Sequence, residues 1–281
     1  MYSAKSVRNW LLALPLALPL GAAALALPAL VPGEAQAAFC SNDGGRFNEW
    51  KQAIKAEYSG QFKASTLAKI DGLQYSTAVI KLDRNQKSFK LSFPEFYKRR
   101  ATGVASGARK RIQQYKKYFD KAEQQFGVPP EIIAAIWGLE SAFGTYKGKS
   151  FPILQSIATL SYDCRRTDLF SREFRAALEV IDRGYADLSK AQGAWAGEIG
   201  QTQFLPSSFL IGATDFDGGG VNVFSSPADV IGSTAKWFAR NGWQRGGDYH
   251  EGAANYGVIQ RWNKAGVYQK TIAKLADEIR G

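Results

Sequence analysis

One helix-forming segment near residue 130 most constrains the fold, because the face that it must bury carries a carboxylate. Pro129 and Pro130 favour a helix start there, since proline suits the first turn. Residues at three- and four-residue spacing then share one face; they are Ile133, Ile136, Trp137 and Glu140. The spacing predicts a helix over about 130–143 that withdraws Glu140 from water.

Such a position favours the protonated form of the Glu140 carboxyl group. Desolvation disfavours the charged form and raises the carboxyl pKa, and the negative end of the helix acts in the same direction. A carboxyl that keeps its proton near neutral pH is suited to protonating a glycosidic oxygen. The alternative is a Glu at an exposed helix end, or one paired with any of the 36 Lys and Arg residues. Spacing alone leaves both interpretations open.

The N-terminal 37 residues predict a signal peptide. Lys5 and Arg8 precede an apolar run over 10–30, and residues 35–37 form a small-x-small cleavage site. The run is long enough to span a bilayer, so an uncleaved anchor is the alternative, but three prolines within the run argue against it. We expect Sec-type export, cleavage near Ala37, a periplasmic location and no stable membrane span in the mature chain.

The charge of the chain points to an anionic partner. The net charge is +11, and residues 1–37 contribute +1 of it, which leaves +10 on the mature chain. On an exported protein, a basic surface suits the cell-wall polymer or a membrane face. Charge alone would also allow nucleic acid. The basic residues are scattered, however, with short runs only at 98–100 and 109–111, so we expect no nucleic-acid partner and a monomer.

Histidine and cysteine usage narrows the chemistry. His250 is the only histidine, which excludes a histidine metal cluster and argues against a Ser-His-Asp triad. The two cysteines, Cys40 and Cys164, predict one disulfide in an oxidising compartment. A lipid anchor on Cys40 is disfavoured, because Phe39 is too large for the position before a lipid-modified cysteine.

Most of the mature chain shows helical spacing of its apolar residues. The expected helices fall at residues 47–58, 112–126, 130–143, 167–185, 229–239 and 268–279. Between them, residues 193–220 are rich in glycine and aromatic side chains and predict a loop-bearing site. Gln201 and Gln203 in this loop offer donors and acceptors for amide and hydroxyl groups. A tight structural turn is the alternative for this segment.

A short acidic segment is similar to the start of a calcium-binding loop. Asp215 and Asp217 fill its first and third positions, and Asp229 could complete a set of oxygen ligands. The fifth position should offer an oxygen ligand but holds Gly219. A metal-free turn of Asp and Gly residues is therefore the alternative.

A second catalytic carboxylate is not marked by any pattern. Glycoside hydrolysis normally uses two carboxylates, and Glu198 and Asp163 are the candidates for the second. Their spacing does not single out either of them. One carboxylate suffices if the substrate supplies the nucleophile from its own acetamido or hydroxyl group.

Taken together, these motifs resemble the lytic murein transglycosylase B family. Four blocks carry the resemblance in family order: residues 127–129 with 136–140, 162–166, 193–209, and 215–218 with Pro227, Asp229 and 231–233. The resemblance implies a mainly α fold: a lysozyme-like helical core with additional N- and C-terminal helices and a small loop/β-hairpin subdomain. It also implies one catalytic domain over 38–281, with an N-terminal helical part (38–126) and a core (127–281) that includes a site loop (193–226).

The resemblance implies cleavage of the β-1,4 bond from N-acetylmuramic acid to N-acetylglucosamine in peptidoglycan glycan strands. The products are 1,6-anhydromuramoyl ends, no water is added, and Glu140 is the single acid/base. Residues that match substrate-binding positions, or that lie in the site loop, are Arg165, Arg166, Gln201, Gln203, Trp237, Asn263 and Tyr268. The alternatives are a hydrolytic muramidase and a catalytically silent murein-binding protein.

Two departures from the family pattern change the expectations. Ala194 stands where some members have Ser, so one hydroxyl contact is lost. Gly219 stands where members often have Asp, which removes a charged ligand from the segment with Asp215, Asp217 and Asp229. We expect weak Ca²⁺ binding at most, on the order of 0.1–1 mM, and no required cofactor.

Overall fold

The computed structural model describes residues 39–85, 91–145 and 148–281. These residues lie within one compact unit. The predicted signal peptide over 1–37 lies outside the described residues. In the described part of the chain, no helix combines the length and the apolar character needed to cross a membrane.

The N-terminal helical part packs aromatic rings against the middle of the chain. Its elements are α1 (Phe47–Glu57), α2 (Ala64–Leu67), η1 (Ala68–Ile70), α3 (Thr77–Arg84) and α4 (Phe93–Arg100). Phe47 and Trp50 on α1 are buried and meet the ring of Tyr162 edge-on. Trp50 also packs on Phe174. The three- and four-residue spacing of the α1 sequence therefore forms an apolar face against the middle helices.

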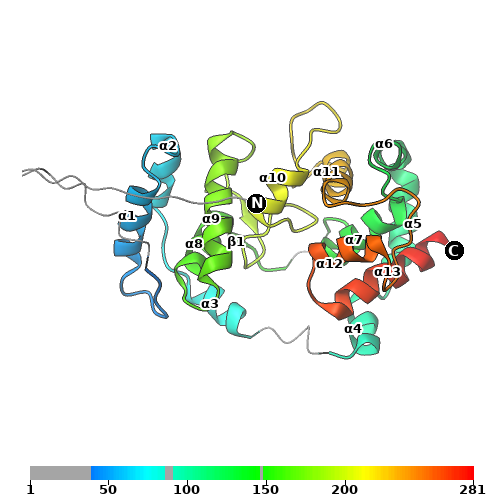
Figure 1. The fold of residues 1–281 in the computed structure, drawn as a ribbon, viewed down its shortest axis with the longest axis horizontal. Coiled ribbons are helices and arrows are strands. Elements are labelled where there is room, and N and C mark those ends of the chain that lie inside the picture. The colour runs from blue at the N-terminus through cyan, green and yellow to red at the C-terminus, as the bar shows by residue number, and fades with distance from the viewer. Residues whose placement is uncertain (1–38, 86–90, 146–147) are drawn as a thin grey trace, which may run out of the picture. The chain divides into compact units, whose positions relative to one another are not determined.

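The middle of the chain is built around the predicted helix that ends near Glu140. Its helices are α5 (Val104–Gln114), α6 (Lys116–Phe126), α7 (Pro130–Ser141), α8 (Ile153–Tyr162) and α9 (Thr167–Asp182). Helix α7 is apolar and buried over residues 132–139, and it packs against α5, α6, α11 and α13. A helix that buries all its faces must be surrounded by other helices, and these four helices lie around α7 (Figure 1).

The single helix expected over 112–126 is divided between α5 and α6. The chain leaves helical geometry at Tyr115, whose φ is −113° and ψ is 28°. The apolar spacing continues across this break, and Ile112 and Tyr115 both pack against the core. Periodicity alone therefore could not reveal the division.

The fold is mainly α, as predicted, and strands are minor within the described residues. Strand β1 (Phe151–Pro152) pairs antiparallel with β2 (Gln192–Gly193), and Phe151 faces Gly193. An isolated bridge between Ile199 and Phe204 closes a turn in the predicted site loop. The same loop contains a helix that the sequence analysis missed, α10 (Pro206–Gly212), with Pro206 at its first position.

Three C-terminal helices complete the core. They are α11 (Pro227–Arg240), α12 (Ala254–Trp262) and α13 (Gly266–Arg280). Helix α13 packs against α4, α5, α7 and α12, so it joins early and late parts of the chain (Figure 1). This contact brings the last helix to the end of α7, where Glu140 lies.

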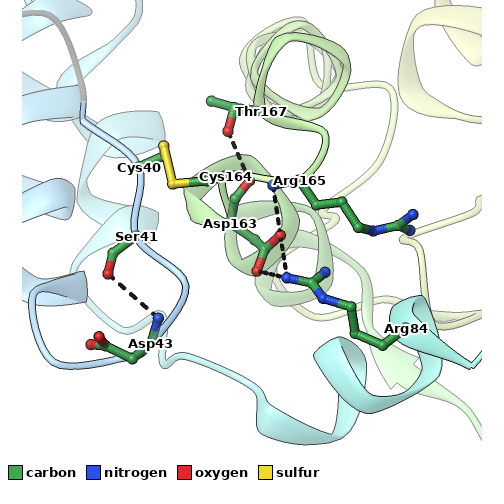
Figure 2. The surroundings of a disulfide bond; sticks show 8 residues. All are labelled: Cys40, Ser41, Asp43, Arg84, Asp163, Cys164, Arg165 and Thr167. Carbon is green, nitrogen blue, oxygen red and sulfur yellow. Dashed lines mark hydrogen bonds and ion pairs between the residues drawn. A yellow bond between two sulfur atoms is a disulfide. The ribbon is translucent and has the colours of Figure 1, made fainter.

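The predicted disulfide is confirmed. Cys40 and Cys164 are bonded, and their Cα atoms lie 5.0 Å apart. The bond ties the start of the described chain to the turn between α8 and α9, next to Asp163 and Arg165 (Figure 2). The backbone N–H of Ser41 also donates to the carbonyl of Tyr162.

Candidate active site

A groove passes over Glu140. It consists of two adjoining cavities of about 530 Å³ and 620 Å³. Among the described residues, those that line both cavities are Arg100, Glu140, Trp195 and Gln203. The helices α4 and α7 and the loop over 193–226 therefore bring these side chains together. The volume of the two cavities is large enough for several sugar rings, since drug-sized ligand sites span about 300–1,000 Å³.

The end of α7 fixes the position of Glu140. Ala142 and Phe143 follow it with left-handed φ values of 49° and 60°, which are costly for residues other than glycine. The Phe143 ring packs edge-on against Trp137 and covers Gly138, where a Cβ would lie 2.8 Å from its Cζ. The missing side chain at residue 138 thus makes room for the ring. Packing of that ring holds the strained turn directly after the carboxylate.

Glu140 has the raised pKa that the sequence analysis expected. Burial is the main cause and raises its pKa to about 7, and the charge of Glu198 acts in the same direction. The hydrogen bond from Tyr268 opposes the rise, as do Arg100 and Trp262. The Tyr268 hydroxyl donates to Oε1 of Glu140 at 2.5 Å. The carboxyl can therefore hold a proton, and also release it, near neutral pH.

Of the two candidates for a second carboxylate, only Glu198 lines the groove. It belongs to the first cavity, and its Oε2 accepts a hydrogen bond of 2.9 Å from the backbone N–H of Ala196. Burial raises its pKa, and backbone N–H donors and Arg166 oppose that rise. Asp163 lines neither cavity. Nη2 of the Arg84 guanidinium instead donates hydrogen bonds to both carboxylate oxygens of Asp163 (Figure 2).

The two neighbouring arginines have different surroundings. Arg166 lines the first cavity, and its guanidinium lies over the rings of Phe170 and Trp195 at 4.8 Å and 5.9 Å. Arg165 lines neither cavity and binds the buried carboxylate of Asp83 through Nε and Nη2. Arg166 binds the same carboxylate. Asp83 therefore holds both arginines, and only Arg166 reaches the groove.

The two glutamines line the groove with their amide groups already engaged. Oε1 of Gln201 accepts a hydrogen bond from the Trp137 indole at 2.8 Å, and Nε2 donates to the carbonyl of Phe224 at 3.0 Å. Nε2 of Gln203 donates to the carbonyl of Gly200 at 2.6 Å, with a backbone φ of 56°. Gln201 lines the second cavity and Gln203 lines both. Gln203 keeps its Oε1 acceptor for a ligand, since a glutamine amide has both an acceptor and two donors.

Of the three predicted substrate-binding residues in the C-terminal helices and the turn between them, two line the groove and one does not. Asn263 and Tyr268 line the first cavity. Trp237 is only 4% exposed and lines neither cavity. It packs edge-on against Trp262, with ring centroids 4.9 Å apart, and Trp262 does line the first cavity. Trp237 thus supports the wall of the groove from behind.

The three acidic residues of the calcium-like segment lie together, away from the groove lining. Carboxylate oxygens of Asp215, Asp217 and Asp229 lie within 4.8 Å of one another. This donor set suits a hard cation such as Ca²⁺. These carboxylates also accept hydrogen bonds: Asp229, on α11, from the backbone N–H groups of Phe216 and Asn222, and Asp217 from the Ser226 hydroxyl. The loop shape therefore has support that does not depend on a metal.

Comparison with known proteins decides the family. A sequence model of the transglycosylase SLT domain matches residues 46–254, well over half of the chain. The chain belongs to the transglycosylase SLT domain family. Membrane-bound lytic murein transglycosylase B of Escherichia coli K12 is 40% identical over 134 residues. That alignment spans 47% of this chain and 37% of the relative.

Solved structures of lytic transglycosylases share the fold of this SLT-domain chain. SltB3 of Pseudomonas aeruginosa, in complex with NAG-NAM-pentapeptide, matches with a TM-score of 0.75 at 24% identity. The match covers 85% of this chain and 80% of the SltB3 chain. Slt35 of Escherichia coli, in complex with calcium, matches with a TM-score of 0.69 at 23% identity. The match covers 88% of this chain and 98% of the Slt35 chain. At these identities the likeness concerns the fold alone.

Two groove residues of this SLT-domain chain were not singled out by the sequence analysis. Trp262 ends α12 and lines the first cavity, and its only sequence signal was its place beside Asn263. Glu198 was one of two unmarked carboxylates. Only the folding of the loop around the Ile199–Phe204 bridge brings Glu198 into the cavity that Glu140 lines.

Proposed function

We propose that this protein is a peptidoglycan lytic transglycosylase. It cleaves the β-1,4 bond from N-acetylmuramic acid to N-acetylglucosamine and forms 1,6-anhydromuramoyl ends. The observation that carries the proposal is Glu140, a carboxyl with a pKa of about 7 at the point where the two cavities of the groove meet. Membership of the SLT domain family supports it.

A single carboxyl can perform both proton transfers of this reaction. Protonated Glu140 gives its proton to the glycosidic oxygen as the bond from C1 breaks, and the bonding electron pair stays on that oxygen. The acetamido carbonyl oxygen of the muramoyl residue attacks C1 and forms an oxazolinium. The C6 hydroxyl then displaces that oxygen at C1, and its proton passes to the Glu140 carboxylate. No water enters, and Glu140 ends in its starting form.

The charges along the groove suit the proposed substrate. Arg99, Arg100 and Lys149 line the second cavity, and Arg166 and Arg261 the first. Peptidoglycan strands carry peptide stems with carboxylates, which a basic groove attracts. SltB3, which shares the fold, was solved with a NAG-NAM-pentapeptide. We further propose export to the periplasm with removal of residues 1–37, and action as a monomer on glycan strands.

Product analysis tests the proposal. Purified sacculi are digested with the wild-type protein and with Glu140→Gln, and the soluble fragments are weighed by mass spectrometry. We expect wild-type fragments that are one water lighter than hydrolysis products. The amide cannot donate and retake the proton, so the variant should lose at least about a hundredfold in rate. Reducing muramic ends as the main product would instead establish a muramidase. If the wild-type protein leaves the turbidity of the sacculus suspension unchanged, the protein is a catalytically silent murein-binding protein.

For the acidic loop, we propose weak Ca²⁺ binding outside the catalytic cycle. Asp215, Asp217 and Asp229 would hold the ion, and its chemistry there would be structural cross-linking of the loop. Gly219 contributes no carboxylate, which lowers the charge of the site and hence its affinity. None of the three residues lines the groove, so none is assigned a part in bond cleavage.

A further inference from the structure

We propose that Glu198 is a positioning residue for the muramoyl acetamido group. Its carboxylate accepts a hydrogen bond from the acetamido N–H of the sugar whose C1 bond breaks, and so orients the acetamido carbonyl toward C1. This inference rests on the proposed function, because it assigns to Glu198 a part in the same reaction. It supplies the second carboxylate that no sequence pattern marked.

The backbone on both sides of Glu198 is held in place. Gly197 has a φ of 81°, and a Cβ there would lie 2.1 Å from Cγ1 of Ile157 on α8. On the other side, Ile199 is fully buried and is joined to Phe204 by backbone hydrogen bonds of 2.7 Å and 3.0 Å. This backbone fixes the direction in which the Glu198 side chain leaves it, and the hydrogen bond from the Ala196 N–H to Oε2 holds the carboxylate. Fixed position is what a group that orients a substrate requires.

The Glu198 carboxylate has acceptor capacity left for a ligand. Its Oε2 accepts from the Ala196 N–H, and its own backbone N–H also favours the charged form. Among the ion pairs of the described residues, Glu198 takes part in none, although it lines the cavity with Arg166. An ionised carboxylate has about four lone-pair sites. Two backbone donors therefore leave sites for an N–H that arrives with the substrate.

The two carboxyl groups share one cavity but differ in the groups that contact them. Charged and titratable groups that line the first cavity are Arg100, Glu140, Arg166, Glu198, Arg261 and Tyr268. Two carboxyls that share one cavity disfavour double ionisation. Burial raises the pKa of both carboxyls, to about 7 at Glu140, where the charge of Glu198 adds to the rise. At Glu198, backbone N–H donors and Arg166 oppose the rise that burial causes. In the proposed reaction Glu140 carries the proton and Glu198 the charge, and the backbone N–H donors and Arg166 beside Glu198 favour this arrangement.

An acceptor at this place acts mainly on the transition state. When the acetamido carbonyl oxygen attacks C1, positive charge spreads over the new ring and its nitrogen. The hydrogen bond from that N–H to a carboxylate strengthens as this charge develops, while the proton stays on nitrogen. An interaction that is stronger in the transition state than in the ground state raises kcat more than it lowers KM.

The alternative is a structural role, in which Glu198 only holds the loop through the Ala196 N–H. Glu198→Gln separates the two, because its amide oxygen can still accept that hydrogen bond but carries no charge. Glu251→Gln is the matched control. Glu251 is exposed, pairs only with Lys270 among the described ion pairs, and lines neither cavity.

The experiment measures kcat and KM on a soluble tetrasaccharide of alternating N-acetylglucosamine and N-acetylmuramic acid, together with the affinity for a thiazoline analogue of the oxazolinium. For Glu198→Gln we expect kcat to fall, and the thiazoline Kd to rise, by about 10- to 100-fold, the range of one hydrogen bond to a charged group. KM should change by less than about threefold, since the ground-state contacts remain. The basic limb of the pH–rate profile should move to lower pH, because the charge that raises the pKa of Glu140 is gone.

Three outcomes overturn the inference. A fall in kcat of less than about fivefold, or an unchanged thiazoline Kd, shows that the charge of Glu198 does not act on the reaction. A loss of activity that follows a lowered thermal midpoint, with an unshifted pH profile, shows a structural role. Wild-type protein that leaves the tetrasaccharide intact overturns the proposed function together with this inference, whereas an active wild type with an unaffected Glu198→Gln overturns this inference alone.

Discussion

Tyr268 donates a 2.5 Å hydrogen bond to Oε1 of Glu140, across 128 residues of sequence. Burial and the facing carboxylate raise the pKa of Tyr268 well above its usual value, so its hydroxyl keeps the proton and stays a donor. The bond favours the ionised form of Glu140, and burial opposes it more strongly. Helix α13 thereby sets how readily the carboxyl at the end of α7 takes back a proton.

Tyr268→Phe should therefore raise the pKa of Glu140 further. The basic limb of the pH–rate profile should move to higher pH, opposite to the shift expected for Glu198→Gln. Rates measured on soluble glycan between pH 4 and pH 9 test this, with Tyr185→Phe, an exposed ring, as control. A profile that coincides with the wild-type profile would show that the bond does not control the titration.

Glu140→Gln should stabilise the fold at alkaline pH. The native pKa of about 7 lies above the usual 4.5, so the native state holds a proton that the unfolded state has released. The stability of the wild type should therefore fall as pH rises between these values, by on the order of 3 kcal/mol at most. Gln does not titrate, so the variant should match the wild type near pH 4 and exceed it above pH 8. Urea unfolding at both pH values, with Glu251→Gln as control, measures the difference; a constant offset would contradict it.

Asp83→Asn should destabilise the protein and loosen Arg166. Asp83 is buried and binds Arg84, Arg165 and Arg166. Loss of its charge should cost about 2–4 kcal/mol, below the largest values for buried pairs because the arginines are partly exposed. Although burial raises the pKa of Asp83, the arginines lower it overall. The contribution of the Asp83 carboxylate to the free energy of unfolding is thus fully present above the pKa of the unfolded state. It is lost as the pH falls through the lower pKa of the native state.

Urea unfolding at pH 7 and at pH 3 tests the Asp83 prediction. The deficit of Asp83→Asn should shrink at the lower pH, because the carboxyl of the unfolded wild type then takes up a proton that the native state does not yet bind. Asp71→Asn is the control, because Asp71 forms an exposed ion pair with Lys55 that should contribute less than about 1 kcal/mol. Equal deficits for the two variants would show that the arginine cluster does not stabilise the fold.

Removal of the disulfide should lower stability substantially. Cys40 and Cys164 lie 124 residues apart, and the chain-entropy treatment of a loop of that length gives about 5 kcal/mol at most. Guanidinium unfolding of the double Cys→Ser variant, compared with the oxidised and the reduced wild type, measures the loss. Two free thiols titrated in the denatured, non-reduced wild type would show that the bond is not formed.

Calcium should bind weakly and without effect on the catalytic site. Titration of chelator-treated protein by calorimetry should give a Kd on the order of 0.1–1 mM. Asp217→Asn should weaken binding further. Asp229→Asn should also lower stability without calcium, since the Asp229 carboxylate accepts two backbone N–H groups. Micromolar binding would mean that the loop offers more ligands than its carboxylates, and a thermal midpoint unaffected by millimolar calcium would favour a metal-free turn.

Local sequence determined the helical fold and the catalytic candidate. The apolar spacing from Ile133 to Glu140 predicts a buried helix that carries a carboxylate, because helix periodicity depends only on nearby residues. Two cysteines in a chain likewise leave one intramolecular pairing, and Cys40 and Cys164 form it. Tyr115, where one predicted helix divides into two, shows the limit of periodicity, since the apolar spacing continues through the break.

Tertiary structure alone decided what surrounds Glu140. Its contact with Tyr268 and its sharing of a cavity with Glu198 depend on how α13 and the loop over 193–226 pack against α7. The same packing places Trp262 in the groove wall with Trp237 behind it. A pKa is set by burial and by the charges nearby in space. Sequence spacing encodes neither for residues that are far apart in the chain, so the surroundings of the acid are set only when the chain folds.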